Sequence, residues 1–214
     1  MINALLTPFC VSCILPLVSP PLFSNDMTEP TKSVRVLQHL INQAVRLDTT
    51  DAIVHTIQRD LAKAIKSGQI QLAAKFCQTK PGSYARRLLL RDEAMGYTVV
   101  VMTWAPGQTT PIHDHAGIWC VEGVVQGEIS VTRYKIERQT GELFLFLDQA
   151  PIRASVGSTG SLIPPDEYHV LANTTDSVAL TLHVYGGEMD HCNVYAPRSG
   201  GWYERAPHKL TYDA

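Results

Sequence analysis

The spacing of apolar positions changes once along this chain, and the change predicts a helical part followed by a β-rich part. Between residues 33 and 67, apolar side chains recur every three or four positions, which is the spacing of a buried helix stripe. We predict one helix from residue 33 to about 45 and a second from about 51 to 67. Gly68 is placed to end the second helix in the left-handed conformation. A short third helix is predicted over residues 71–77.

After Pro81 and Gly82 the period becomes two, and short apolar runs are separated by Gly, Pro, Asn and Asp. The predicted strands cover residues 84–90, 97–104, 110–115, 118–125, 128–136, 142–147, 152–156, 161–163, 168–172, 178–185 and 192–195. Because no helix separates them, we predict a mainly β fold, an antiparallel barrel or double-sheet jelly roll with the helices as an attached layer.

Composition narrows the possible partners. The 214 residues are 45% hydrophobic, which is enough for one domain with a full core. The formal net charge is −2, and Lys and Arg are dispersed along the chain. A nucleic acid partner is therefore not expected, because a basic surface stripe is missing from the sequence.

The first 26 residues form an apolar, proline-rich segment without a basic start. We interpret residues 1–26 as a disordered leader or a start-site extension, with an export leader as the alternative. Its prolines argue against a spanning helix, so no membrane partner is expected. Residues 27–214 are predicted to form a single domain, with helices over about 33–77 and a barrel over about 84–205.

Cysteine usage indicates a reducing compartment, and we expect the protein to be cytoplasmic. The five cysteines are an odd number at irregular spacing, unlike the even framework of a small secreted scaffold. Cys10 and Cys13 have the spacing of a zinc or redox pair, but no second pair accompanies them. We interpret them as ordinary apolar residues of the leader.

Three histidines have a spacing that predicts a metal site. Residues two apart in a strand project from the same face, so His113 and His115 can offer ring nitrogens to one point in the barrel. His169, in a later strand, is the expected third ligand. Asp114, between the first two, is expected to face away from the metal.

These residues carry a resemblance to a known family. Gly107, His113, His115, Cys120 and Gly127 resemble the first cupin motif, with cysteine where most cupins have a metal-binding glutamate. A run from Pro164 through His169 to Asn173 resembles the second motif, although Asp166 stands where glycine is usual. In detail the chain is similar to the cysteine dioxygenase family of thiol dioxygenases, which implies a cupin-type barrel.

The resemblance extends to residues around the expected metal. Tyr84 and Arg86 resemble the family's Tyr-x-Arg segment, in which the arginine holds the substrate carboxylate and the tyrosine lines the pocket. Thr181, His183 and Tyr185 resemble its Ser/Thr-x-His-x-Tyr strand. The resemblance further implies a thioether bond between Cys120 and Tyr185, as several family members form this cross-link.

Strand alternation assigns directions to these side chains. Thr181, His183 and Tyr185 lie on one face of their strand, so we expect Thr181 to hold His183 and His183 to hold the Tyr185 hydroxyl. Arg86 shares a face with Tyr84, whereas Arg87 lies on the opposite face. Arg86 is therefore the expected carboxylate clamp, since a planar guanidinium binds a carboxylate with two parallel hydrogen bonds.

The ligand set suggests the chemistry. Three neutral imidazoles without a carboxylate leave the full charge on a divalent metal and keep coordination positions open for a thiolate. We expect Fe(2+) as the cofactor, and L-cysteine and O2 as small-molecule substrates. Transfer of both oxygen atoms to sulfur would give the sulfinic acid.

Other interpretations remain open from sequence alone. A 3-mercaptopropionate or broad small-thiol dioxygenase has the same ligands, although relatives that prefer 3-mercaptopropionate usually carry glutamine where Arg86 stands, which favours cysteine. A cupin isomerase or hydrolase using zinc, manganese or nickel would need a general base near the metal. A noncatalytic cupin sensor would bind thiols without turnover. Cys120, Tyr84 and the pair of Thr181 and His183 could also be ordinary core residues.

Overall fold

The computed structural model describes residues 31–214, so the predicted leader over residues 1–26 lies outside the described part. Helix α1 (Lys32–Ala44) starts at Thr31, whose hydroxyl accepts a hydrogen bond from the Val34 amide at 3.4 Å. Helix α2 (Thr50–Lys66) starts in the same way at Thr49, which accepts from the Ala52 amide at 3.2 Å. Both predicted helices are confirmed within one residue at each end.

The end of the helical part differs in detail from the expectation. Gly68 has a φ of +71°, as predicted for the residue that ends the second helix. The third helix, predicted over 71–77, is a single 3-10 turn, η1 (Ala74–Cys77), without a side-chain cap. Within residues 31–214, no helix is both long enough and apolar enough to cross a bilayer.

The remainder of the described chain forms strands that join into two antiparallel sheets. The strands are β1 (Ala85–Asp92), β2 (Tyr97–Trp104), β3 (Ile112–His113), β4 (Cys120–Gln126), β5 (Glu128–Thr140), β6 (Leu143–Asp148), β7 (Ile152–Ser155), β8 (Thr159–Leu162), β9 (His169–Ala172), β10 (Ala179–Tyr185), β11 (His191–Pro197) and β12 (Trp202–Lys209). One sheet has the order β1-β2-β10-β4-β8, and the other has the order β6-β12-β11-β3-β9-β5-β7. The mainly β, cupin-type antiparallel barrel with an N-terminal helical layer is therefore confirmed.

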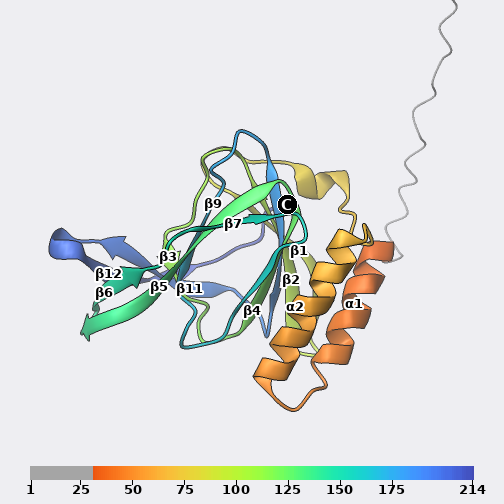
Figure 1. Cartoon of the computed structure of the whole chain (residues 1–214), viewed down its shortest axis with the longest axis horizontal. Helices are drawn as coiled ribbons and strands as arrows, with labels where there is room; N and C mark the ends of the chain where they lie inside the picture. Colours follow the sequence, from red (N-terminus) through yellow and green to blue (C-terminus); the bar gives the residue numbers. More distant parts are fainter. Residues whose placement is uncertain (1–30) are drawn as a thin grey trace, which may run out of the picture.

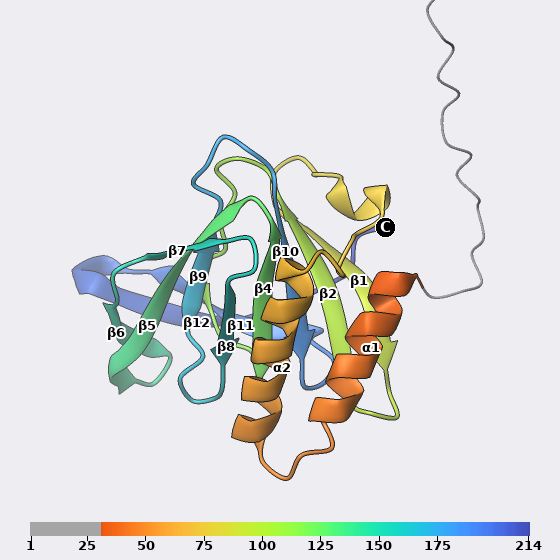
Figure 2. The same ribbon diagram turned by 45° about the vertical axis from the view of Figure 1, so that its right-hand side comes forward.

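The two helices cover the outer face of the five-stranded sheet (Figures 1 and 2). Strand β2 is buried along its whole length, which explains why its sequence contains no charged residue. Val99 and Val101 pack with the helices in one core, whereas Val100 and Met102 belong to a second core inside the barrel. The helical layer thus closes the back of the sheet, and the inner face is left to line the site.

One strand was missed by the sequence analysis. Strand β12 pairs with β11 and β6 and, with β5 and β6, forms the arm that extends from the barrel in Figure 1. Its sequence contains Pro207 and charged residues, and its side chains are only partly buried. The apolar alternation that identifies a strand is therefore weak in this segment.

The backbone conformation at Gly127, the last residue of the first motif, requires glycine. Its φ is +71°, and a Cβ atom there would lie 2.8 Å from the Val178 carbonyl oxygen. Glycine lets β4 turn tightly into β5 at this point. The turn directly follows β4, the strand that carries Cys120.

Candidate active site

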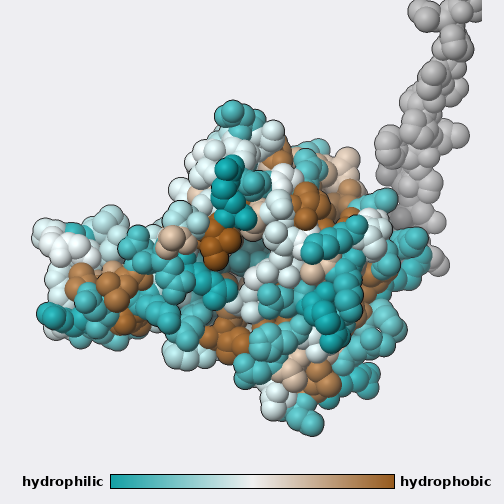
Figure 3. Space-filling view, viewed as in Figure 1, coloured by the Kyte–Doolittle hydropathy of each residue, from teal (hydrophilic) through white to brown (hydrophobic). Residues whose placement is uncertain are grey.

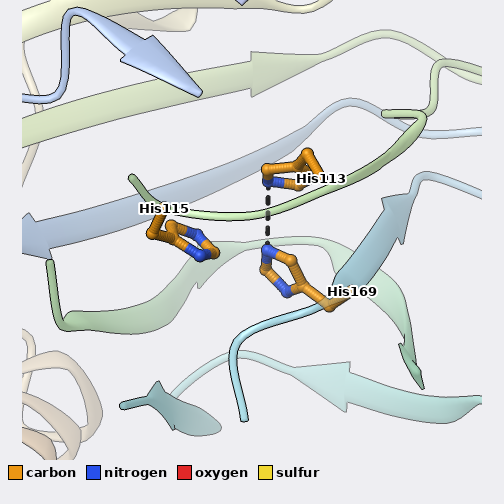
Figure 4. A group of neighbouring side chains, drawn as sticks. All are labelled: His113, His115 and His169. Carbon is orange, nitrogen blue, oxygen red and sulfur yellow. Dashed lines mark hydrogen bonds between the residues drawn. The ribbon is translucent and has the colours of Figure 1, made fainter. Parts of the chain in front are cut away.

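Three histidine side chains point toward one another inside the barrel (Figure 4). His113 in β3 lies directly opposite His169 in β9, and their Nε2 atoms are 3.1 Å apart. His115 completes the group, since the candidate ligand nitrogens of all three lie within 4.8 Å of one another. The structure therefore brings together the trio that the spacing predicted.

His115 is positioned in the trio by side-chain hydrogen bonds rather than by the strand pairing that the sequence predicted. The predicted strand over 110–115 pairs as a strand only at Ile112–His113, so His115 lies beyond its end. Asp114 anchors this segment by accepting hydrogen bonds from the Asn193 amide and side chain, each at 2.8 Å, and from the Tyr195 hydroxyl at 3.0 Å. Asp114 thus faces away from the trio, as predicted. On the other side, Glu167 accepts from the His115 amide at 2.6 Å.

The local contacts favour neutral, metal-binding imidazoles. His113 Nδ1 lies 3.1 Å from the Pro111 carbonyl oxygen, which can only accept, so this nitrogen carries the proton. The lone pair of a neutral His113 ring is then on Nε2, which faces His169. Burial lowers the pKa of His113, and it lowers those of His115 and His169 further below the usual value. Neutral imidazoles converging on one point fit a divalent metal ion.

A small cavity beside His113 holds the expected substrate-binding residues. Tyr84, Arg86, His113 and Tyr185 all line it. The Arg86 guanidinium donates to the Met189 carbonyl at 2.5 Å, whereas its Nε has no hydrogen-bond partner. A buried cationic group with an unused donor beside the trio is suited to binding an anionic ligand group.

Arg87 lies on the opposite face of β1, as strand alternation predicted. Its Nε donates to the Ala214 carbonyl at 3.0 Å, and its Nη1 donates to the Gln78 carbonyl at 2.8 Å. Both donors are used to hold backbone segments outside the barrel. The two adjacent arginines are therefore both buried but face different environments.

Cys120 and Tyr185 are neighbours across two adjacent strands. They are directly opposite in the β4–β10 pairing, and both are buried. Burial raises the pKa of the Cys120 thiol and that of the Tyr185 hydroxyl well above their ordinary values. Both groups are thus protonated at neutral pH, and their placement is compatible with a bond between them.

The hydrogen bonds of His183 differ from the expectation. Thr181 Oγ1 lies 2.8 Å from His183 Nε2, as predicted, and Trp104 Nε1 donates to the same hydroxyl at 2.9 Å. The expected hydrogen bond from His183 to the Tyr185 hydroxyl is not found in the described part of the chain. Instead, the His183 and Tyr185 rings are stacked with centroids 6.1 Å apart, and His183 Nδ1 faces Glu122.

Glu122 is a site residue that the sequence analysis missed. Its Oε1 lies 3.2 Å from His183 Nδ1 and 3.7 Å from His169 Nε2. An acidic side chain thus lies beside the trio, although the motif position itself holds Cys120 and the group His113, His115 and His169 contains no carboxylate. Alternation could have identified it, because Glu122 is two residues after Cys120 and so shares its barrel-facing side.

Unsatisfied polar atoms are concentrated at this site. Among residues 31–214, the buried side-chain atoms without a hydrogen-bond partner are Arg86 Nε, His115 Nδ1, Glu122 Oε1, His169 Nδ1 and His183 Nδ1. Each unpaired buried group is costly, and all of them belong to the residues described above. Such a concentration is expected where a fold is shaped to receive a ligand.

Inward-facing histidines in an antiparallel barrel define the class as a cupin with a candidate metal site. Comparison with known families then identifies the group within that class. The profile of the cysteine dioxygenase type I family matches residues 24–198. The chain therefore belongs to the cysteine dioxygenase type I family, and it is a thiol dioxygenase of the metal-dependent kind.

Solved structures are similar to part of the chain. A protein from Thermus thermophilus has 21% identity and a TM-score of 0.42, covering 54% of this chain and 94% of its own. A double-stranded β-helix protein from Klebsiella pneumoniae has 18% identity and a TM-score of 0.42, covering 64% and 96%. A cupin superfamily protein from Desulfitobacterium hafniense has 12% identity and a TM-score of 0.39, covering 56% and 91%.

Proposed function

We propose that this protein is an iron(II) cysteine dioxygenase that converts L-cysteine and O2 to cysteine sulfinic acid. The observation that carries the proposal is the placement of buried Arg86 in a cavity that His113, a member of the histidine trio, also lines. His113, His115 and His169 would hold the metal through neutral imidazoles. Bound iron(II) would supply a site where the substrate thiolate and O2 meet.

The residues around the trio would bind and orient the substrate. Arg86 would take the carboxylate, using its unpaired Nε–H and a terminal N–H in a planar fork. Tyr84 lies against Trp104, with ring centroids 4.5 Å apart, and forms a rigid wall of the same cavity. Tyr185 would direct its hydroxyl toward the substrate from the other side of that cavity. Burial of these groups excludes water and strengthens the ion pair between arginine and carboxylate.

The reaction needs no external reductant. The thiol sulfur loses four electrons and forms two bonds to oxygen, while the two oxygen atoms of O2 accept those electrons. The S–H proton leaves to solvent, so a thiol and O2 give a sulfinate and a proton. Thr181 and His183 are positioning residues in this proposal, because they hold side chains that border the reacting groups.

A product analysis with several thiols tests the proposed function. We expect iron-loaded protein to consume one O2 for each L-cysteine and to form the sulfinate, which mass spectrometry detects as a gain of two oxygen atoms. 3-Mercaptopropionate should react with a lower kcat/KM, because it lacks the amino group of cysteine. Equal or reversed preference would contradict the choice of cysteine, and absence of any sulfinate would contradict the whole proposal. The same assay with zinc-loaded protein serves as the control.

The placement of Cys120 opposite Tyr185 leads to a prediction about a thioether bond. After many turnovers we expect a second species that is lighter by two hydrogen atoms and migrates faster on a denaturing gel. Forming the C–S bond removes the thiol hydrogen and a ring hydrogen, and O2 takes up both hydrogens with their two electrons to give H2O2. The species should disappear in Cys120→Ser, which lacks the thiol, and in Tyr185→Phe, which lacks the phenol that activates the ring. Cys77→Ser, at an exposed cysteine, is the matched control and should retain it.

The redox state of the cysteines is relevant to the cellular location of the protein. Cys77, Cys120 and Cys192 are all free thiols in the described residues. Burial raises the pKa of Cys192 to about 12, and Cys192 lines the Arg86 cavity. Free buried thiols are usual in reducing compartments, and this supports our proposal of a cytoplasmic location.

A further inference from the structure

Two side chains of opposite charge lie on different sides of the histidine trio. Arg86 lines the small cavity to which His113 contributes. Glu122 lines a separate cavity of about 410 Å³, to which His169 contributes. Figure 3 shows a hollow near the position of β7, a strand that lines this larger cavity. A ligand bound at the trio would therefore have a cation on one side and a carboxylate on the other.

Glu122 has an acceptor atom that the protein itself does not use. Its side chain is 12% exposed, and its Oε1 atom has no hydrogen-bond partner. His183 Nδ1 is 3.2 Å away but is not in line for a hydrogen bond, so it also remains unpaired. Arg133, a cation of the same cavity, donates to the Ser161 carbonyl at 2.6 Å. Leaving a buried carboxylate oxygen unpaired is costly unless a ligand supplies the donor.

Hydrogen bonds among Trp104, Thr181 and His183 orient the His183 ring beside this carboxylate. Trp104 donates to Thr181 Oγ1, so the hydroxyl hydrogen of Thr181 is free to be donated to His183 Nε2. In the neutral ring the proton of His183 is then on Nδ1, which faces Glu122. Glu122 and His183 are also directly opposite in the β4–β10 pairing. His183 therefore directs its Nδ1 toward Glu122 rather than toward the Tyr185 hydroxyl, and Glu122 Oε1 stays unpaired.

We propose that Glu122 is a specificity-determining residue that accepts a hydrogen bond from the amino group of an amino thiol. In such a substrate the nitrogen is two carbon atoms from sulfur, so it stays close to the trio when sulfur binds there. Glu122 Oε1 is 3.7 Å from His169 Nε2, within reach of that nitrogen. Arg86 would take the carboxylate and Glu122 the amine. The inference rests on the proposed function, since it concerns the same thiol site.

Four thiols separate the contributions of the two charged residues. L-Cysteine has both groups, 3-mercaptopropionate has only the carboxylate, 2-aminoethanethiol has only the amine, and ethanethiol has neither. Their binding to iron-loaded protein without O2 is measured by calorimetry, and kcat/KM is measured with O2. The variants are Glu122→Leu and Glu122→Gln, which retains the size of the side chain. Glu142→Gln, at an exposed glutamate paired with Arg205, is the control for loss of one negative charge.

We expect Glu122→Leu to weaken L-cysteine and 2-aminoethanethiol about tenfold to a hundredfold, the range for a hydrogen bond to a charged group. 3-Mercaptopropionate and ethanethiol should bind equally well or better, because a buried unpaired acceptor is removed. Glu122→Gln should show a smaller loss in the same direction, and Glu142→Gln should show none.

Two outcomes would overturn the inference. One is an equal loss for all four thiols, which would indicate a general effect on the site. The other is a reduced iron content of Glu122→Gln before any thiol is added, which would make the carboxylate a metal ligand. Selective binding without turnover of any thiol would leave the inference standing and refute the proposed dioxygenase function. Turnover without an amine-dependent effect of the Glu122 substitutions would refute the inference and leave the proposed dioxygenase function standing.

Discussion

Replacing His169 with alanine should leave the protein folded but unable to retain iron or to form sulfinate. His169 contributes one of three nitrogens that converge within 4.8 Å, and the remaining two would hold the metal in a poorly fixed geometry. Loss of a partner that only supports a ligand typically costs about 10–100-fold in metal affinity or activity. Loss of the ligand itself should exceed that range. Metal content after dialysis and sulfinate formation are the measurements.

The matched control for this experiment is His55→Ala, at an exposed position of helix α2. It should retain the iron content and the activity of the unchanged protein. The melting temperature of metal-free His169→Ala distinguishes loss of a ligand from loss of the fold. Full iron binding by a folded His169→Ala protein would refute the proposed metal site.

The sequence predicted the trio because its members are local or carry a recognisable motif. His113 and His115 are two residues apart, and the glycines on either side mark turns that the chain needs. Strand alternation, which we expected to bring the two histidines together, explains their convergence only in part. Asp114 holds the segment through Asn193 and Tyr195, whereas strand pairing ends at His113. Such long-range anchoring is not visible in a local pattern.

Features that depend on strand register were predicted less well. Glu122 belongs to the site because β4 pairs with β10 in a register that places it opposite His183. Alternation alone placed Thr181, His183 and Tyr185 on one face, and this was correct. It could not show which neighbour each ring nitrogen would meet, so the expected hydrogen bond from His183 to the Tyr185 hydroxyl was wrong. Strand β12 was missed because its partners, rather than its apolar pattern, define it.

Substituting Arg86 with glutamine should lower kcat/KM for thiols that carry a carboxylate and leave it almost unchanged for thiols that do not. Two charge-assisted hydrogen bonds at about 1.5–3 kcal/mol each correspond to a loss of about a hundredfold or more. We therefore expect kcat/KM to fall by this factor for L-cysteine and for 3-mercaptopropionate. 2-Aminoethanethiol should be almost unaffected. Arg86→Lys should be intermediate, because it retains the charge but loses the planar fork.

Arg86 also supports the structure, and the experiment must separate the two effects. Its guanidinium donates to the Met189 carbonyl and stacks on the Tyr212 ring at 4.6 Å, so its loss should lower the free energy of unfolding by about 1–3 kcal/mol. Arg87→Gln is the matched control, since Arg87 is equally buried and holds carbonyl groups on the other face. It should lower stability similarly while changing kcat/KM for all thiols by the same small factor. If the two variants have the same thiol profile, Arg86 is a structural residue and the carboxylate binds elsewhere.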